Sequence, residues 1–106
     1  MDKLLTVVVP VYNMEKYLDR CLSSLVVSNE LMTQLEVIVI NDGSTDGSLD
    51  IMLGYSKKYQ EIFNIIDKKN GGHGSCWNVG LKEARGKYVS FLDSDDWYDN
   101  TEFCEL

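Results

Sequence analysis

The sequence predicts an α/β protein with a Rossmann-like parallel sheet whose strands alternate with helices. Apolar runs rich in β-branched residues recur four times along the chain, and each is bounded by polar residues. The segments between them carry apolar residues at helical spacing. A β-α-β-α-β-α-β order is typical of a parallel sheet with right-handed crossovers, which is therefore the expected fold class.

The first strand is predicted over residues 4–12, a nearly continuous apolar run. Because apolar and polar residues do not alternate in it, the run fits a central strand buried on both faces. Pro10 is expected at the end of the strand, since proline has no N–H for the sheet ladder. A one-faced amphipathic helix follows over residues 14–27, with Asn13 as its predicted cap and Glu15 in its first turn.

The second strand is predicted over residues 35–40 and leads into a polar loop, residues 41–48. Most residues of that loop favour turns or helix caps, so a second helix is expected to begin near its end. The third strand is predicted over residues 62–67, and a glycine-rich loop follows over residues 68–75.

The last helix is expected to be short and to carry Trp77 and Leu81 at i, i+4. This spacing places both side chains on one apolar face, so Trp77 is predicted to lie in the core. Gly86 is well placed to end the helix. The fourth strand then runs over residues 87–92.

An acidic cluster follows the fourth strand directly, because three carboxylates occur within residues 93–96. Extended residues two apart point to the same side, so Asp93 and Asp95 are expected to project together. Carboxylate oxygens of this kind suit Mg²⁺ or Mn²⁺. A solvated acidic turn is the alternative that the carboxylates alone leave open.

Length and charge limit the class of protein. The chain has 106 residues and a net charge of -7, and its ten basic residues are not clustered. It is expected to form one domain over residues 1–106, with no nucleic-acid partner, because a basic face supplies most of the affinity for nucleic acid. Three distant cysteines do not indicate a disulfide framework, and no apolar run approaches the ~20 residues that span a bilayer. A cytoplasmic location is expected.

Ligands of parallel sheets bind at the carboxyl ends of the strands, where the polar segments of this chain are expected to meet. The glycine loop lacks the ending of a Walker A sequence and the third glycine of a dinucleotide fingerprint. Asp42, at the end of the second strand, is suited to accept a hydrogen bond from a base N–H or a ribose hydroxyl. An Asx-turn or cap that holds the loop is the alternative for this residue.

Four blocks in this order resemble the nucleotide-binding half of a family 2 glycosyltransferase of the GT-A fold. They are VVVPVYN (7–13), INDGSTDGS (40–48), KNGGHGSCWNVGL (69–81) and GKYVSFLDSDDW (86–97). The resemblance implies the donor-binding part of an inverting, metal-assisted enzyme. Such an enzyme moves a sugar from a nucleotide-diphosphate sugar, expected to be UDP-linked, to an acceptor hydroxyl.

The resemblance also implies particular site residues. Those expected to hold the nucleotide are Pro10, Tyr12, Asn13, Glu15, Asp42, Gly72 and Asp93. Asp95 is expected to ligate the Mn²⁺ or Mg²⁺ that bridges the donor diphosphate, and Asp93 to face the ribose or the water shell of the metal. The glycine loop departs from the family pattern at residues 73–75, and Trp97 is a further candidate to stack on a base or sugar.

In the family, the catalytic base lies well beyond the Asp-x-Asp motif, in a half that binds the acceptor. The chain ends at Leu106, so it is expected to be truncated after the motif and inactive alone. The intact enzyme is expected to use a glycan or lipid-linked acceptor, in the cytoplasm or at the inner face of the membrane, and the isolated chain to self-associate through the truncated face. The alternative is a non-catalytic nucleotide-binding or interaction module that retains the fold.

Overall fold

The computed structural model describes residues 3–26, 35–60 and 62–92. Its elements, in chain order, are β1 (Lys3–Val11), α1 (Glu15–Ser23), β2 (Leu35–Asp42), α3 (Ser48–Lys58), β3 (Phe63–Lys68), α4 (His73–Glu83) and β4 (Gly86–Phe91). Within these ranges no helix combines the length and the apolar character needed to cross a membrane. The Asp-x-Asp motif and the terminal aromatic residues lie outside the described residues.

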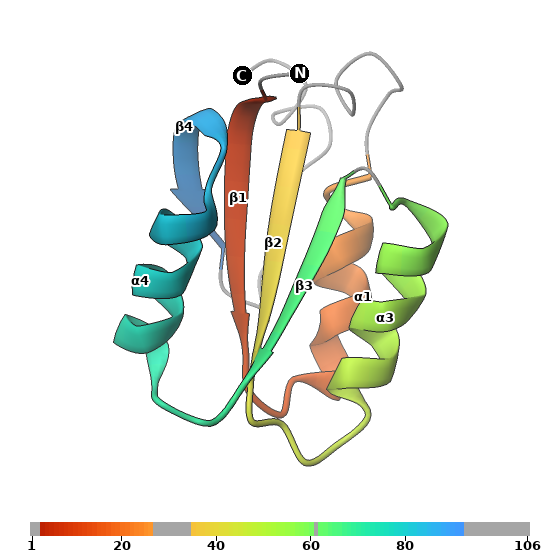
Figure 1. Ribbon diagram of the computed structural model, residues 1–106. Coiled ribbons are helices and arrows are strands. Elements are labelled where there is room, and N and C mark those ends of the chain that lie inside the picture. The colour runs from red at the N-terminus through yellow and green to blue at the C-terminus, as the bar shows by residue number, and fades with distance from the viewer. Residues whose placement is uncertain (1–2, 27–34, 61, 93–106) are drawn as a thin grey trace.

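The four strands form one parallel sheet in the order β3-β2-β1-β4, which confirms the predicted fold class. β1 is central, because it pairs with β2 on one side and with β4 on the other. The helices α1 and α3 cover one face of the sheet, and α4 covers the other (Figure 1). The chain therefore reverses its direction of winding between β3 and β4, as in doubly wound folds.

The core is built from the two inner strands, whose residues are buried on both faces. Alternate residues of β1 enter opposite layers, since successive side chains of a strand point to opposite faces. Val7 and Val9 pack beneath α1 and α3, whereas Val8 packs with Ile38 and Cys76 beneath α4. The continuous apolar run that predicts β1 thus fills two separate clusters.

Pro10 lies one residue before the end of β1, close to its predicted position. The backbone N–H of Leu92 donates to the carbonyl of Val8, so residues 8 and 10 turn their backbone groups toward β4. The last register pair of β4 is Phe91 with Val8. The missing N–H at Pro10 therefore coincides with the end of the ladder between β1 and β4.

The prediction that Trp77 lies in the core is wrong. Trp77 is 43% exposed and Leu81 is 54% exposed. The Trp77 ring lies 5.4 Å from that of Phe91, centroid to centroid. The buried side of α4 is formed instead by Cys76 and Gly80. A Cβ at Gly80 would lie 2.5 Å from a methyl group of Val8, so the absent side chain lets α4 approach the sheet closely.

Gly86 does not end the last helix, contrary to prediction, because α4 ends at Glu83 and Gly86 begins β4. Its N–H donates to Thr6 Oγ1 at 2.8 Å, and a Cβ would lie 2.5 Å from the backbone nitrogen of Thr6. The glycine is required by this close approach of β4 to β1.

The buried carboxylate of Glu36 fixes the same end of the sheet. Glu36 is 1% exposed and accepts hydrogen bonds from Thr6 Oγ1 at 2.9 Å and from the backbone N–H of Arg85, also at 2.9 Å. The Arg85 guanidinium pairs with the second oxygen at 2.6 Å. These contacts join β1, β2 and the turn before β4, at the end of the sheet opposite the predicted ligand edge.

Candidate functional site

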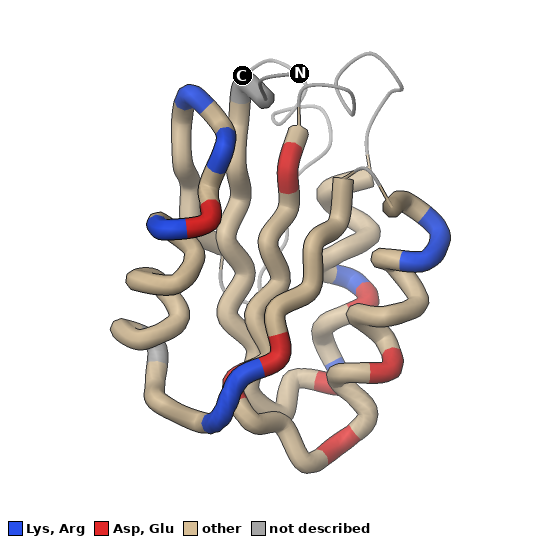
Figure 2. The backbone as a smooth tube through the Cα atoms, viewed as in Figure 1, with Lys and Arg blue, Asp and Glu red and all other residues tan. Residues whose placement is uncertain are grey.

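The polar segments that follow β1, β2 and β3 meet at one edge of the molecule, as predicted. The three strands are parallel, so the loops after their carboxyl ends lie together (Figure 1). Basic and acidic segments both border this edge (Figure 2). The fourth predicted segment, residues 93–96, lies outside the described residues, and the described part of the chain reaches Leu92 directly after β4.

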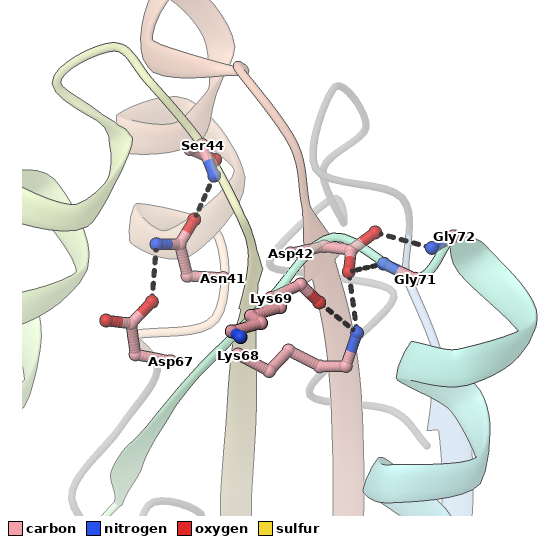
Figure 3. A network of polar contacts seen from close by, with 8 residues as sticks. All are labelled: Asn41, Asp42, Ser44, Asp67, Lys68, Lys69, Gly71 and Gly72. Atoms are coloured by element: carbon pink, nitrogen blue, oxygen red, sulfur yellow. Dashed lines mark hydrogen bonds and ion pairs between the residues drawn. The ribbon is translucent and has the colours of Figure 1, made fainter.

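The centre of the edge is the carboxylate of Asp42, the last residue of β2. Its Oδ1 accepts hydrogen bonds from Lys68 Nζ at 2.7 Å and from the Gly71 N–H at 2.8 Å, and its Oδ2 accepts one from the Gly72 N–H at 2.9 Å (Figure 3). The side chain retains only 6% of its exposure. Asp42 therefore binds the loop between β3 and α4, and these contacts differ from the local Asx-turn or cap that the sequence left open.

Two glycines allow the loops to approach Asp42 so closely. A Cβ at Gly71 would lie 2.9 Å from Ser75 Oγ and 3.0 Å from Lys68 Nζ. A Cβ at Gly43 would lie 2.9 Å from the backbone nitrogen of Asn70, and Gly43 has φ 78°, a left-handed value that favours glycine. Side chains at these positions would push the two loops apart.

Charge and hydrogen bonding control the ionisation of this group. Burial alone would raise the pKa of Asp42, but the hydrogen bonds from Lys68, Gly71 and Gly72, together with the Lys68 charge, outweigh it and hold that pKa below its usual value. The buried Cys76 thiol lies near the carboxylate. Its burial, and then the negative charge of Asp42, raise the pKa of Cys76, so the carboxylate is ionised beside a neutral thiol.

Asn41 joins the ends of β2 and β3. Its Nδ2 donates to Asp67 Oδ1 at 2.9 Å, and its Oδ1 accepts a hydrogen bond from the Ser44 N–H at 3.2 Å (Figure 3). The loop after β2 is therefore held on one side by Asn41 and on the other by the contacts of Asp42.

Asn13 does not cap the first helix, contrary to prediction. It adopts φ 51° and binds the loop after β2: its Oδ1 accepts from the Thr45 N–H at 2.7 Å, and its own N–H donates to Ser44 Oγ at 3.0 Å. α1 begins two residues later, at Glu15. The left-handed conformation, which asparagine tolerates, turns the chain from β1 toward its neighbouring loop.

The first turn of α1 is capped by side chains from another part of the chain. The Met14 N–H donates to Ser48 Oγ at 3.0 Å, and the Glu15 N–H donates to Asp46 Oδ2 at 3.1 Å. Asp46 Oδ1 also accepts from the Ser48 N–H at 2.9 Å, at the start of α3. One carboxylate thus caps two helices, and the loops after β1 and β2 form a single unit.

The predicted site residues differ in their surroundings. Pro10 is buried inside β1, whereas Tyr12 is 45% exposed at the edge and Glu15 is exposed beside it. Gly72, with φ 86°, reaches Asp42 through its backbone. In the described ranges no three His, Cys, Asp or Glu side chains lie close enough to hold a metal ion together. The ligand roles of these residues, and those of Asp93 and Asp95, stay predictions.

Sequence reasoning missed Lys68 and Gly71 as partners of Asp42, and Asp46 and Ser48 as caps of α1. A lysine next to a glycine loop is indistinguishable from a solvated one until its strand is paired with β2. The polar block 41–48 signalled caps for α3 but gave no sign that it also caps a helix more than thirty residues earlier.

An open parallel sheet with a carboxylate, an exposed aromatic ring and a glycine loop at its carboxyl edge is typical of nucleotide-binding α/β domains. Comparison with known proteins specifies the family. The sequence profile of glycosyl transferase family 2 matches residues 6–106, so the chain belongs to that family, and the fold is its GT-A nucleotide-binding domain.

Relatives of known structure and sequence agree with this assignment. The glycosyltransferase GlyA of Streptococcus pneumoniae is 42% identical over 97 residues, which are 92% of this chain and 14% of GlyA. The crystal structure of Staphylococcus aureus TarS 1–349 in complex with UDP-GlcNAc superposes with a TM-score of 0.86 at 36% identity, over 96% of this chain and 29% of that one. A mannosyltransferase of Pyrobaculum calidifontis shares the fold, with a TM-score of 0.82 at 23% identity, over 92% of this chain and 29% of the mannosyltransferase. The chain spans less than a third of the length of each.

Proposed function

We propose that this chain is the donor-binding part of an inverting glycosyltransferase that uses a UDP-linked sugar. The acceptor hydroxyl attacks the anomeric carbon from the side opposite the nucleotide. The new glycosidic bond forms while the bond from that carbon to the diphosphate breaks, and a base in the acceptor-binding half takes the hydroxyl proton. The nucleotide diphosphate is the leaving group.

The observation that carries this proposal is an ionised, nearly buried carboxylate at the carboxyl end of β2. A carboxylate accepts hydrogen bonds and donates none, so Asp42 matches an N–H donor of a base. The exposed ring of Tyr12 lies at the same edge and offers a face on which a base can stack. The TarS structure, a complex with UDP-GlcNAc, supports a UDP-linked donor.

We further propose that Mn²⁺ or Mg²⁺ binds at Asp95 and Asp93. The paired carboxylates are hard oxygen ligands that suit either ion. When bound, the ion would neutralise the diphosphate and stabilise it as a leaving group. The chain alone repels a diphosphate, because its net charge is -7.

The test is calorimetric titration of the chain with UDP, in Mn²⁺, in Mg²⁺ and in EDTA. We expect binding in either metal to be at least tenfold tighter than in EDTA, and Asp95→Asn to remove most of that difference. Asp50→Asn, which removes an exposed carboxyl at the start of α3, is the matched control and should keep the difference. Equal affinity with and without metal would refute the metal proposal, and no UDP binding under any condition would refute the donor-site proposal.

A further inference from the structure

The hydrogen bonds around Asp42 limit how many further donors it can accept. A carboxylate has four lone-pair positions, two on each oxygen. On Oδ1 both are used, by Lys68 Nζ at 2.7 Å and the Gly71 N–H at 2.8 Å. On Oδ2 the Gly72 N–H uses one. The nearby thiol of Cys76 is a weak donor that a stronger one can displace.

The remaining capacity is therefore one strong hydrogen bond, on Oδ2. The side chain is 6% exposed, so only a small part of it is open to a ligand. Lys68 is itself 82% buried, given the 18% exposure of its side chain, and its Nζ is further fixed by the carbonyl of Lys69 at 2.8 Å. The bonds to Oδ1 are therefore part of the folded loop itself.

Nucleotide bases differ in what they require of such a group. Uracil and thymine present a single N–H between two carbonyls, which one acceptor position satisfies. Guanine presents two adjacent N–H donors, and it needs both oxygens of a carboxylate to be free on the same side. An unpaired buried donor costs far more affinity than a slightly weaker contact, so the number of free positions decides between the two bases.

We infer that Lys68 is a positioning residue that sets the base specificity of the donor site: by occupying Oδ1 of Asp42 it leaves one acceptor position, which selects a base with a single N–H over guanine. This inference rests on the proposed function. It assigns a role to a lysine that contacts the base only through Asp42, and it deepens the proposal by naming the feature that favours a uracil-type donor.

The test compares UDP and GDP affinities, measured by calorimetry in the same metal buffer, for the unmodified chain and three variants. Lys68→Met should reduce the preference for UDP over GDP about tenfold, because one position on Oδ1 becomes free. Lys68→Arg keeps a donor at that place and should restore the preference. Lys69→Met removes the same charge from an exposed side chain that forms no ion pair within the described residues, so it should weaken both nucleotides equally and keep their ratio.

A measurement on the unmodified chain keeps the inference testable if Lys68→Met does not fold. The amide protons of Gly71 and Gly72 should stay protected from exchange when UDP binds, since the base takes the unused position. Faster exchange of these two amides in UDP would overturn the inference, because the base would then replace the loop. So would an unchanged UDP-to-GDP ratio in folded Lys68→Met. A chain that binds neither nucleotide would refute the proposed function as well, which separates the two failures.

Discussion

At the scale of single residues, Asp42 both fixes the loop between β3 and α4 and is the group proposed to bind the nucleotide base. The carboxylate is ionised because three donors surround it, and the same donors fix the loop between β3 and α4. The sequence predicted this residue from its place at a strand end. Its partner Lys68 was not predicted, because nothing in the local sequence shows that β3 aligns Lys68 with Asp42 in the sheet register.

The first prediction concerns the charge at this position. Asp42→Asn keeps the shape of the side chain but replaces one acceptor oxygen by an amide that faces a donor, and it removes the charge that pairs with Lys68. We expect UDP affinity to fall at least tenfold, the cost of one lost hydrogen bond of about 1–2 kcal/mol to a buried group. Calorimetry in Mn²⁺ measures this.

The matched control is Asp67→Asn at the end of the neighbouring strand, where an exposed carboxyl accepts a single hydrogen bond from Asn41. It should change UDP affinity less than threefold. If both variants lose affinity equally, the effect belongs to the total charge of the edge and the specific role of Asp42 is wrong.

At the scale of elements, the loops after β1 and β2 stabilise each other across the sheet edge. Neither α1 nor α3 has a side-chain bond from its own N-cap residue. Their first N–H groups are satisfied by Asp46 and Ser48, which stand in the loop between β2 and α3 and at the start of α3. A local cap at Asn13 was the natural prediction, and the long-range bond prevails because Asn13 is itself held by Thr45.

The second prediction follows from this shared cap. Asp46→Ala removes the acceptor for the first turn of two helices at once, so we expect the free energy of unfolding to fall by about 1–3 kcal/mol, more than the usual loss at a single cap. Urea unfolding followed by circular dichroism measures it.

Asp50→Ala supplies the comparison. Asp50 is exposed in the first turn of α3, so this substitution removes an equal charge near the same helix end. We expect it to cost less than half as much. Similar losses in the two variants would mean that Asp46 acts through the helix dipole alone and not through its hydrogen bonds.

At the scale of the whole molecule, the sequence predicts the parallel sheet and the edge at which the loops after its strands meet. It does not predict the hydrogen bonds that hold those loops in place. Continuous β-branched runs separated by helical spacing predict parallel strands, and parallel strands bring their following loops together. The side of α4 that packs was misjudged, because spacing puts Trp77 and Leu81 on one face but cannot show that Gly80 offers the closer approach. Bonds between residues thirty or more apart leave no local signal.

The third prediction concerns acid unfolding of the whole chain. Among the residues that the structure describes, three carboxyls, those of Glu36, Asp42 and Asp46, have a pKa that is lowered in the fold. For each, burial alone would raise the pKa, and hydrogen bonds outweigh it, from Arg85 and Thr6 in the case of Glu36. A carboxyl whose pKa is lower folded than unfolded stabilises the fold above its unfolded pKa, and this contribution disappears as the pH falls through its folded pKa.

In the unfolded chain the pKa values of such carboxyls lie at about 4. The free energy of unfolding should therefore be almost constant between about pH 6 and 8 and should decline from about pH 4.5 downward. Glu36→Gln should be less stable at pH 7 and should show a shallower decline, because one of the three groups no longer titrates. Asp50→Asn removes an exposed carboxyl and should keep the slope of the unmodified chain. The urea midpoint of unfolding, measured from about pH 3 to 8 for each variant, tests this prediction. If the midpoint falls with pH equally in Glu36→Gln and in the unmodified chain, acid destabilises the fold through the other carboxyls. The buried Glu36 carboxylate, paired with Arg85, would then not be the group responsible.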